Sequence, residues 1–162
     1  MKNRPTLPAL AALAFAVAAL ALLQPSPLAA QRFGMLTTIE PAKLVGVLKD
    51  MGMDAKDDSE GDTKKVLWML GDQRCFFFFP PGGESIQFYY GVTGTDVTLQ
   101  DINTWNRDYR YSRAYMDDDG DPILELDLDL AGGISEGRLK DFVTTCQVSF
   151  DKWRSNIISK KP

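Results

Sequence analysis

The chain of 162 residues contains no histidine. Histidine supplies the general base of most Ser-His-Asp and Cys-His active sites, because its ordinary pKa lies closest to neutrality. It is also a frequent zinc ligand. The usual serine and cysteine hydrolases and most zinc enzymes are therefore excluded, and no catalytic residue is predicted.

Phosphate-binding glycine loops and a basic surplus are absent as well. Gly91, Gly94 and the pair Gly132-Gly133 lack the G-x-G-x-x-G spacing and the lysine that follows a P-loop glycine. The formal net charge is −4, whereas nucleic acid requires a positive surface. We therefore expect no cofactor and no nucleic-acid partner.

Cysteine is scarce, with only Cys75 and Cys146 in the chain. They do not form a C-x-x-C pair, so a thioredoxin-like role has no support. In an oxidising compartment they could form a disulfide, which would stabilise the fold by roughly 4 kcal/mol in the chain-entropy model. Two buried thiols are the alternative, and the sequence leaves both open because it gives no Cα distance.

Residues 1–30 have the three parts of a secretory signal peptide. Two basic residues precede an apolar run over 7–23, and small residues at 28–30 offer a cleavage site. The run is shorter than the ~20 residues that span a bilayer, and Gln31 stands where a lipid-anchor signal needs cysteine. We expect a cleaved signal, no stable membrane anchor, and a periplasmic or secreted protein.

The rest of the chain has the length of one domain. The signal carries two basic residues and no acidic one, so its removal lowers the net charge from −4 to −6. We predict a short N-terminal segment over 31–37, a single α+β domain over 38–158 and a tail over 159–162.

Apolar periodicity predicts the elements of this domain. In chain order they are helix 38–51, strands 65–70, 74–79 and 85–90, helix 99–109, strands 111–116 and 122–130, and helix 135–158. The polar segment 54–61 stays unassigned, with an exposed edge strand as one interpretation. The order α-β-β-β-α-β-β-α predicts an α+β fold, in which helices pack on one face of an antiparallel sheet of about five strands.

Two local predictions concern burial. Leu99, Ile102 and Trp105 have the spacing of a buried face on the helix over 99–109. The apolar run over 76–79 predicts a strand that is covered on both faces or central in the sheet.

The last two strands suggest an interaction face. Pairing Ala114 with Leu124 turns the leucines of the final strand inward and places Tyr111 opposite Asp127. The outward residues form the candidate interaction face, because tyrosine is enriched at interface hot spots and opposite charges can pair across strands. These residues are Tyr111, Arg113, Tyr115, Glu125 and Asp127.

Acidic residues offer two further hypotheses. The turn over 117–121 could bind a hard cation such as Ca²⁺, but it departs from the EF-hand spacing, and a hairpin turn also explains its composition. Glu125, Asp127 and Asp129 alternate along one strand and could serve a carboxylate-dependent hydrolase. A solvated strand face is the simpler interpretation, so no metal ligand is assigned.

The segment over 102–133 and the order of helix and strands before it resemble the YbjN domain family, and the similarity covers about residues 36–158. The resemblance is carried by the I-N-x-W-N motif, the acidic hairpin that starts at Tyr115-Met116, and the A-G-G-I start of the last helix. It implies a bacterial sensory-transduction regulator with a fold similar to type III secretion chaperones, which are non-enzymatic proteins that commonly dimerise and hold extended polypeptides. Well-known members of the family lack an export signal, whereas we expect one in this chain.

We therefore expect an exported, non-enzymatic module that binds a protein partner or regulates a process of the cell envelope. The partner is unknown, and a homodimer is one form that the resemblance implies. The alternatives are a small-ligand or cation sensor that uses the acidic turn, and the hydrolase described above.

Overall fold

The computed structural model describes residues 34–159. The expected signal peptide, the start of the segment over 31–37 and the end of the tail lie outside the described residues. All elements below belong to the unit that begins at Met35.

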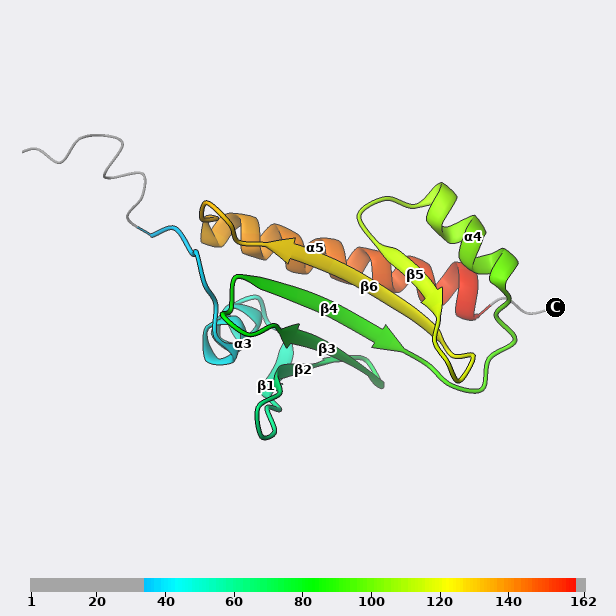
Figure 1. The fold of residues 1–162 in the computed structure, drawn as a ribbon, viewed down its shortest axis with the longest axis horizontal. Coiled ribbons are helices and arrows are strands. Elements are labelled where there is room, and N and C mark those ends of the chain that lie inside the picture. Colours follow the sequence, from blue (N-terminus) through cyan, green and yellow to red (C-terminus); the bar gives the residue numbers. More distant parts are fainter. Residues whose placement is uncertain (1–33, 160–162) are drawn as a thin grey trace, which may run out of the picture. The chain divides into compact units, whose positions relative to one another are not determined.

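Within the described residues, three α-helices accompany one antiparallel sheet of six strands (Figure 1). In chain order the elements are α3 (Pro41–Asp50), β1 (Asp54–Asp57), β2 (Lys64–Leu70), β3 (Gln73–Phe79), β4 (Ser85–Gly91), α4 (Leu99–Asp108), β5 (Arg113–Met116), β6 (Pro122–Asp129) and α5 (Glu136–Trp153). A π-helical turn over Arg154–Ile158 continues α5.

The predicted α+β class is confirmed. The strands lie in the order β1-β2-β3-β4-β6-β5, and every neighbouring pair is antiparallel. The sheet has six strands where about five were expected, because the unassigned polar segment forms β1 and pairs with β2 along the edge.

The predicted register of the last two strands is also confirmed. Ala114 pairs with Leu124, and Arg113 pairs with Glu125. The pairing of Tyr111 with Asp127 was wrong, because β5 begins only at Arg113. Tyr111 has a φ of 67°, a left-handed backbone conformation that cannot continue a strand.

Side chains on one face of the sheet pack with the helices into a single core. Phe77, Phe88 and Leu126 lie side by side across three neighbouring strands and are buried. Phe142 of α5 packs over Phe77, with 6.4 Å between the ring centres. This apolar row fixes α5 against the sheet, because burial of aromatic and leucine side chains is the largest favourable term in folding.

The short helix α4 has a different apolar face from the one predicted. Ile102 and Trp105 are buried as expected, but Leu99 is 67% exposed. Leu99 is the first residue of the helix, and Thr98 and Asp101 form a capping box around it. The cap sets where the helix starts, and Leu99 lies outside the core at that position.

The two cysteines lie on facing elements, Cys75 on β3 and Cys146 on α5. Both are buried free thiols in this structure. The last helix thus directs Cys146 into the core, and the disulfide stays a prediction. Within residues 34–159, no helix combines the length and the hydropathy that a bilayer-spanning segment needs.

Candidate interaction face

The face of the sheet that points away from this core is the candidate interaction face, and we call it the open face. The pairing register assigns side chains from all six strands to it. Its main residues are Lys65, Leu67, Arg74, Phe76, Phe78, Gln87, Tyr89, Arg113, Tyr115, Ile123, Glu125 and Asp127. Aromatic and charged side chains are interleaved on it, a composition found at protein interfaces.

An aromatic cluster occupies the middle of the open face. Phe76 and Phe78 stack with 5.9 Å between ring centres, and Tyr89 meets Phe78 edge-on at 5.7 Å. Lys65 and Arg74 lie over the Phe76 ring at 5.6 and 5.5 Å. The cluster is held by ring contacts and cation–π attraction between its own members, so it is half-buried without a helix above it.

The strand that contains the run over 76–79 is central in the sheet, as one of the two predicted alternatives has it, but the described residues do not cover it on both faces. Phe77 and Phe79 face the core, whereas Phe76 and Phe78 lie half-exposed on the open face. The continuous apolar run is split by the alternation of the strand, which sends successive side chains to opposite faces. The sequence analysis missed this part of the face, although strand parity could have identified it.

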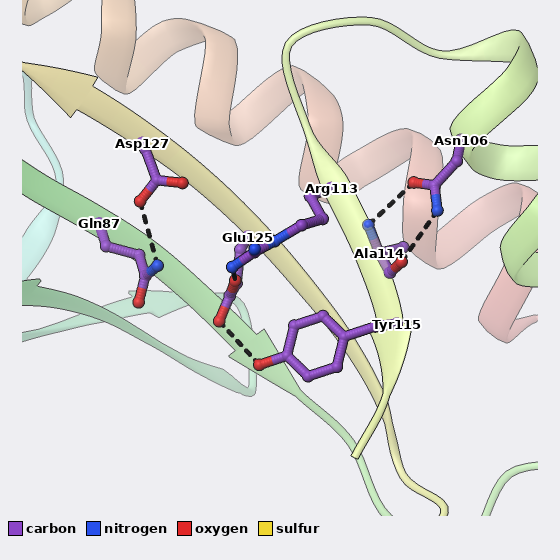
Figure 2. A network of polar contacts seen from close by, with 7 residues as sticks. All are labelled: Gln87, Asn106, Arg113, Ala114, Tyr115, Glu125 and Asp127. Carbon is purple, nitrogen blue, oxygen red and sulfur yellow. Dashed lines mark hydrogen bonds and ion pairs between the residues drawn. The ribbon is translucent and has the colours of Figure 1, made fainter.

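Glu125 forms the polar centre beside the aromatic cluster (Figure 2). Arg113 donates to its Oε2 and Tyr115 Oη donates to its Oε1 at 2.8 Å. Glu125 is only 4% exposed, so the prediction of a solvated carboxylate was wrong for this residue. Arg113 and Tyr115 reach this carboxylate because β5 pairs with β6 and places Arg113 directly opposite Glu125.

The two tyrosines next to this carboxylate are held in the neutral form. Burial, followed by the hydrogen bond to Glu125, raises the pKa of Tyr115 from 10.0 to about 12. Burial is also the first cause that raises the pKa of Tyr89. Both phenols therefore stay protonated throughout the neutral range, and Tyr115 donates its hydrogen to Glu125.

The other predicted face residues have different positions. Asp127 is exposed on the open face and accepts a hydrogen bond from Gln87 Nε2 at 3.0 Å (Figure 2). Tyr111 is 80% exposed but lies in the loop before β5, beside a cavity next to α5. The structure thus brings Arg113, Tyr115 and Glu125 into contact, and it separates Tyr111 from them.

The acidic turn is a hairpin connection between β5 and β6. The carboxylate of Asp117 accepts the backbone N–H groups of Asp119 and Asp121, at 3.1 and 2.8 Å. Gly120 has a φ of 81°, which glycine adopts without strain. Among the described residues, no group of three or more acidic or cysteine side chains is placed to hold a metal ion.

Asn106 of the I-N-x-W-N motif bonds to the backbone of the neighbouring strand β5. The Asn106 side chain donates to the Ala114 carbonyl and accepts from the Ala114 N–H, both at 2.9 Å (Figure 2). It therefore pairs with the outer edge of β5 as a neighbouring strand would. Trp105, one position earlier, is fully buried and stacks on Tyr109 with 4.0 Å between ring centres.

Comparisons with known proteins agree with this architecture. The YbjN family model, described as "Putative bacterial sensory transduction regulator", matches residues 40–158. A crystal structure described as "YbjN, a putative transcription regulator from E. coli" matches with a TM-score of 0.54 and 14% identity, over 78% of this chain and 99% of that one. At this identity the likeness concerns the fold alone. None of the curated proteins matches the chain.

Proposed function

We propose that this chain, which belongs to the YbjN family, is an exported regulatory module that binds a protein partner through its open face. The family match covers nearly all of the described residues, and the description of the family indicates a regulator. The partner, the export and the absence of catalysis are our inferences. The observation that carries the proposal is the half-exposed aromatic cluster of Phe76, Phe78 and Tyr89.

The chemistry of the open face favours a protein over a small molecule as the partner. Aromatic rings with cations above them provide large contact areas with little conformational entropy to lose. Lys65, Arg74 and Arg113 add donors around the rings, and Asp127 adds an acceptor at their border. A partner surface with apolar and acidic groups would complement this arrangement.

A regulatory role also agrees with how the one buried carboxylate among the described residues is used. Glu125 is engaged by Arg113 and Tyr115 and is only 4% exposed. A carboxylate-dependent hydrolase would need carboxylates that are free to reach a substrate, whereas both oxygens of Glu125 already accept hydrogen bonds. Asp127 and Asp129, the other carboxylates of the hydrolase hypothesis, are both exposed.

Photocrosslinking in the native host tests the binding proposal. A photoreactive phenylalanine analogue replaces Phe78 in the full chain, and a second variant carries it at Leu99, an exposed apolar residue at the start of α4 (67% exposed). We expect a discrete protein adduct from position 78 and none of that size from position 99. Adding Arg74→Glu should remove the adduct, since it reverses a charge over the ring cluster.

Two results would contradict the binding proposal. One is the absence of any discrete adduct from position 78 in cells that express the folded protein. The other is an adduct that persists at equal yield with Arg74→Glu. An adduct twice the mass of the chain would show a homodimer, and the open face would then bind a second copy in place of a different partner.

Cell fractionation tests the export. We expect the full chain in the periplasm or medium with a new N-terminus near Gln31, and deletion of residues 2–30 should retain it in the cytoplasm. A full chain that stays uncleaved in the cytoplasm would refute this part of the proposal and leave the binding face in place.

A further inference from the structure

Half of β6 has no neighbouring strand on one side. β4 pairs with β6 along its length, from Asp129 back to Ile123. On the other side, β5 pairs only with the first half, Pro122 to Glu125 (Figure 1). No other strand of the described residues lies beside Leu126 to Asp129 on the β5 side.

The backbone of this half presents free hydrogen-bonding groups. In an antiparallel strand, successive residues bond alternately to the two neighbours. The Leu130 N–H donates to the carbonyl of Glu84, just before β4 begins. The even-numbered residues of β6 therefore form their backbone hydrogen bonds with β4. Asp127 and Asp129 therefore direct their N–H and C=O groups to the unoccupied side. No backbone hydrogen bond to Asp127 on that side is formed within residues 34–159.

A cavity of about 470 Å³ lies between this edge and α5. Leu126 and Asp127 line it from β6, Phe142 and Thr145 line it from the helix, and Tyr111 lines it from the loop before β5. The ion pair of Arg138 and Asp141 on α5 also lines it, so the apolar part of the wall is formed by Leu126 and Phe142. Apolar side chains of an added strand would have space there, beside the backbone groups that would pair with it.

Tyr111 is a second indication that the free edge of β6 binds a partner. Its φ of 67° is a strained backbone conformation for a non-glycine residue. The ring is 80% exposed, so no burial within the described residues offsets the strain. It also lines a second cavity of about 470 Å³, together with Val148 of α5. A ring in this position would cover a strand laid along β6.

We infer that the free edge of β6 binds an extended segment of a partner protein as an added strand. The side chains of that segment would alternate between apolar and basic residues. Apolar ones would face Phe142 and Thr145 in the cavity, and basic ones would lie across from Asp127 and Asp129, which are exposed. Main-chain pairing supplies affinity in such complexes, and the alternate side chains supply specificity.

Charge argues against a second copy of this chain as the occupant. An antiparallel pair of two β6 edges would bring the Asp127 and Asp129 carboxylates of one copy close to those of the other. Like charges across neighbouring strands are destabilising. The same carboxylates favour lysine or arginine in a heterologous strand.

This inference names a second surface, which shares only Asp127 with the open face. The β6 edge contributes backbone groups and the Asp127 and Asp129 carboxylates, whereas the open face contributes the aromatic cluster. A failure at the edge therefore leaves the crosslink from position 78 as it is, and the reverse also holds.

Peptide binding to the purified full chain tests the inference. The probe is a capped peptide of about seven residues, roughly one strand long, in which valine alternates with lysine. We expect saturable binding by fluorescence anisotropy. Asp127→Pro should weaken it about tenfold, because it removes an outward N–H and places a ring at the pairing site. Proline is tolerated at such an edge position, so the fold is expected to survive.

The matched control is Asp127→Asn, which keeps the N–H and removes the charge. It should weaken binding by about two- to fivefold, the range of one cross-strand charge pair. Replacing lysine with glutamate in the peptide should weaken binding more than either variant. If Asp127→Pro fails to fold, methylation of alternate backbone nitrogens in the peptide gives the same test from the other strand.

Several results would overturn the inference. Equal affinity of the lysine and glutamate peptides would exclude the role of the carboxylates. Undiminished binding by folded Asp127→Pro, or by the N-methylated peptide, would exclude strand pairing. A wild-type dimer in sedimentation that Asp127→Pro makes monomeric would show that a second copy occupies the edge.

Discussion

At the scale of single residues, Glu125 shows how a neighbour changes the meaning of a charged position. It alternates with Asp127 and Asp129 along β6, but only the latter two are exposed. Arg113 and Tyr115 enclose Glu125 because β5 covers that half of β6. A buried carboxylate with two donors is stable where a lone one would not be, since its oxygens keep hydrogen bonds in place of water.

The first prediction concerns the ionisation of Tyr115. Burial and then the hydrogen bond to Glu125 raise its pKa to about 12. Glu125→Gln removes the charge that opposes the phenolate, so the pKa of Tyr115 should fall toward 10. Ultraviolet absorbance of the phenolate during an alkaline titration measures it, with Tyr115→Phe as the control that identifies the transition. An unchanged transition in Glu125→Gln would mean that burial alone determines this pKa.

The same shift sets a pH window for stability. The folded-state pKa of Tyr115 lies above the ordinary value of 10.0. The phenol therefore contributes its stabilisation in full below pH 10 and loses it as the pH rises toward about 12. Urea unfolding at pH 9 and pH 11.5 should show a smaller loss of stability in Tyr115→Phe than in the wild type. A larger loss in the variant would contradict this sign.

At the scale of elements, the I-N-x-W-N segment joins α4 to the edge of the sheet. Trp105 anchors the helix in the core and meets Trp153 of α5 edge-on, with 5.0 Å between ring centres. Asn106 then bonds to both backbone groups of Ala114 on β5. An unpaired strand edge is a template for unwanted association, and here a side chain occupies it.

Asn106→Ala should expose this edge. We expect it to lower the free energy of unfolding by about 1 kcal/mol, since two backbone hydrogen bonds are lost where water can partly replace them. Asn103→Ala, an exposed change in the same helix, should have a much smaller effect. Urea unfolding measures both variants. Equal stability of the two would show that the Asn106 contacts contribute nothing.

The edge also has a consequence for association. Freed Ala114 groups on β5 should increase the tendency of Asn106→Ala to self-associate, which sedimentation velocity detects at increasing concentration. The wild type under the same conditions is the reference. A variant that stays as monomeric as the wild type would show that the short β5 edge is harmless without its cover.

At the scale of the whole molecule, the core ties the sheet to α5 through side chains distant in sequence. Cys75 of β3 and Cys146 of α5 are among them, and both are fully buried. Burial raises the pKa of Cys75 to about 12 and raises that of Cys146 well above its ordinary value. The nearby Cys75 also adds to the shift of Cys146.

The reduced protein should therefore react slowly with a thiol reagent at pH 8, because the thiolate is the reactive species. Both cysteines should become reactive together in urea, at the midpoint of global unfolding, as mass spectrometry of the adducts can show. Rapid reaction of one cysteine in the native protein would contradict the packing of α5 on β3. Protein that reacts only after reduction would establish the predicted disulfide.

Most of the helices and strands were predictable from periodicity. The side chains and elements that lie beside each of them in the fold were not. Residues 76–79 illustrate the limit: the sequence shows four phenylalanines, but strand alternation divides them between the core and the open face. Tyr111 illustrates another, since its parity with Arg113 predicted a strand position that its left-handed backbone excludes. Local patterns do not record where the backbone changes direction.

The sequence by itself determined the order of the elements, the register of Ala114 on Leu124, the family and the kinds of chemistry that a chain without histidine excludes. These follow from side-chain period and composition, which are properties of neighbours in the chain. Only the tertiary structure decided that Glu125 is enclosed, that Asn106 pairs with β5 and that half of β6 keeps a free edge. Those facts depend on which strand lies beside which and for how many residues, and long-range packing sets both.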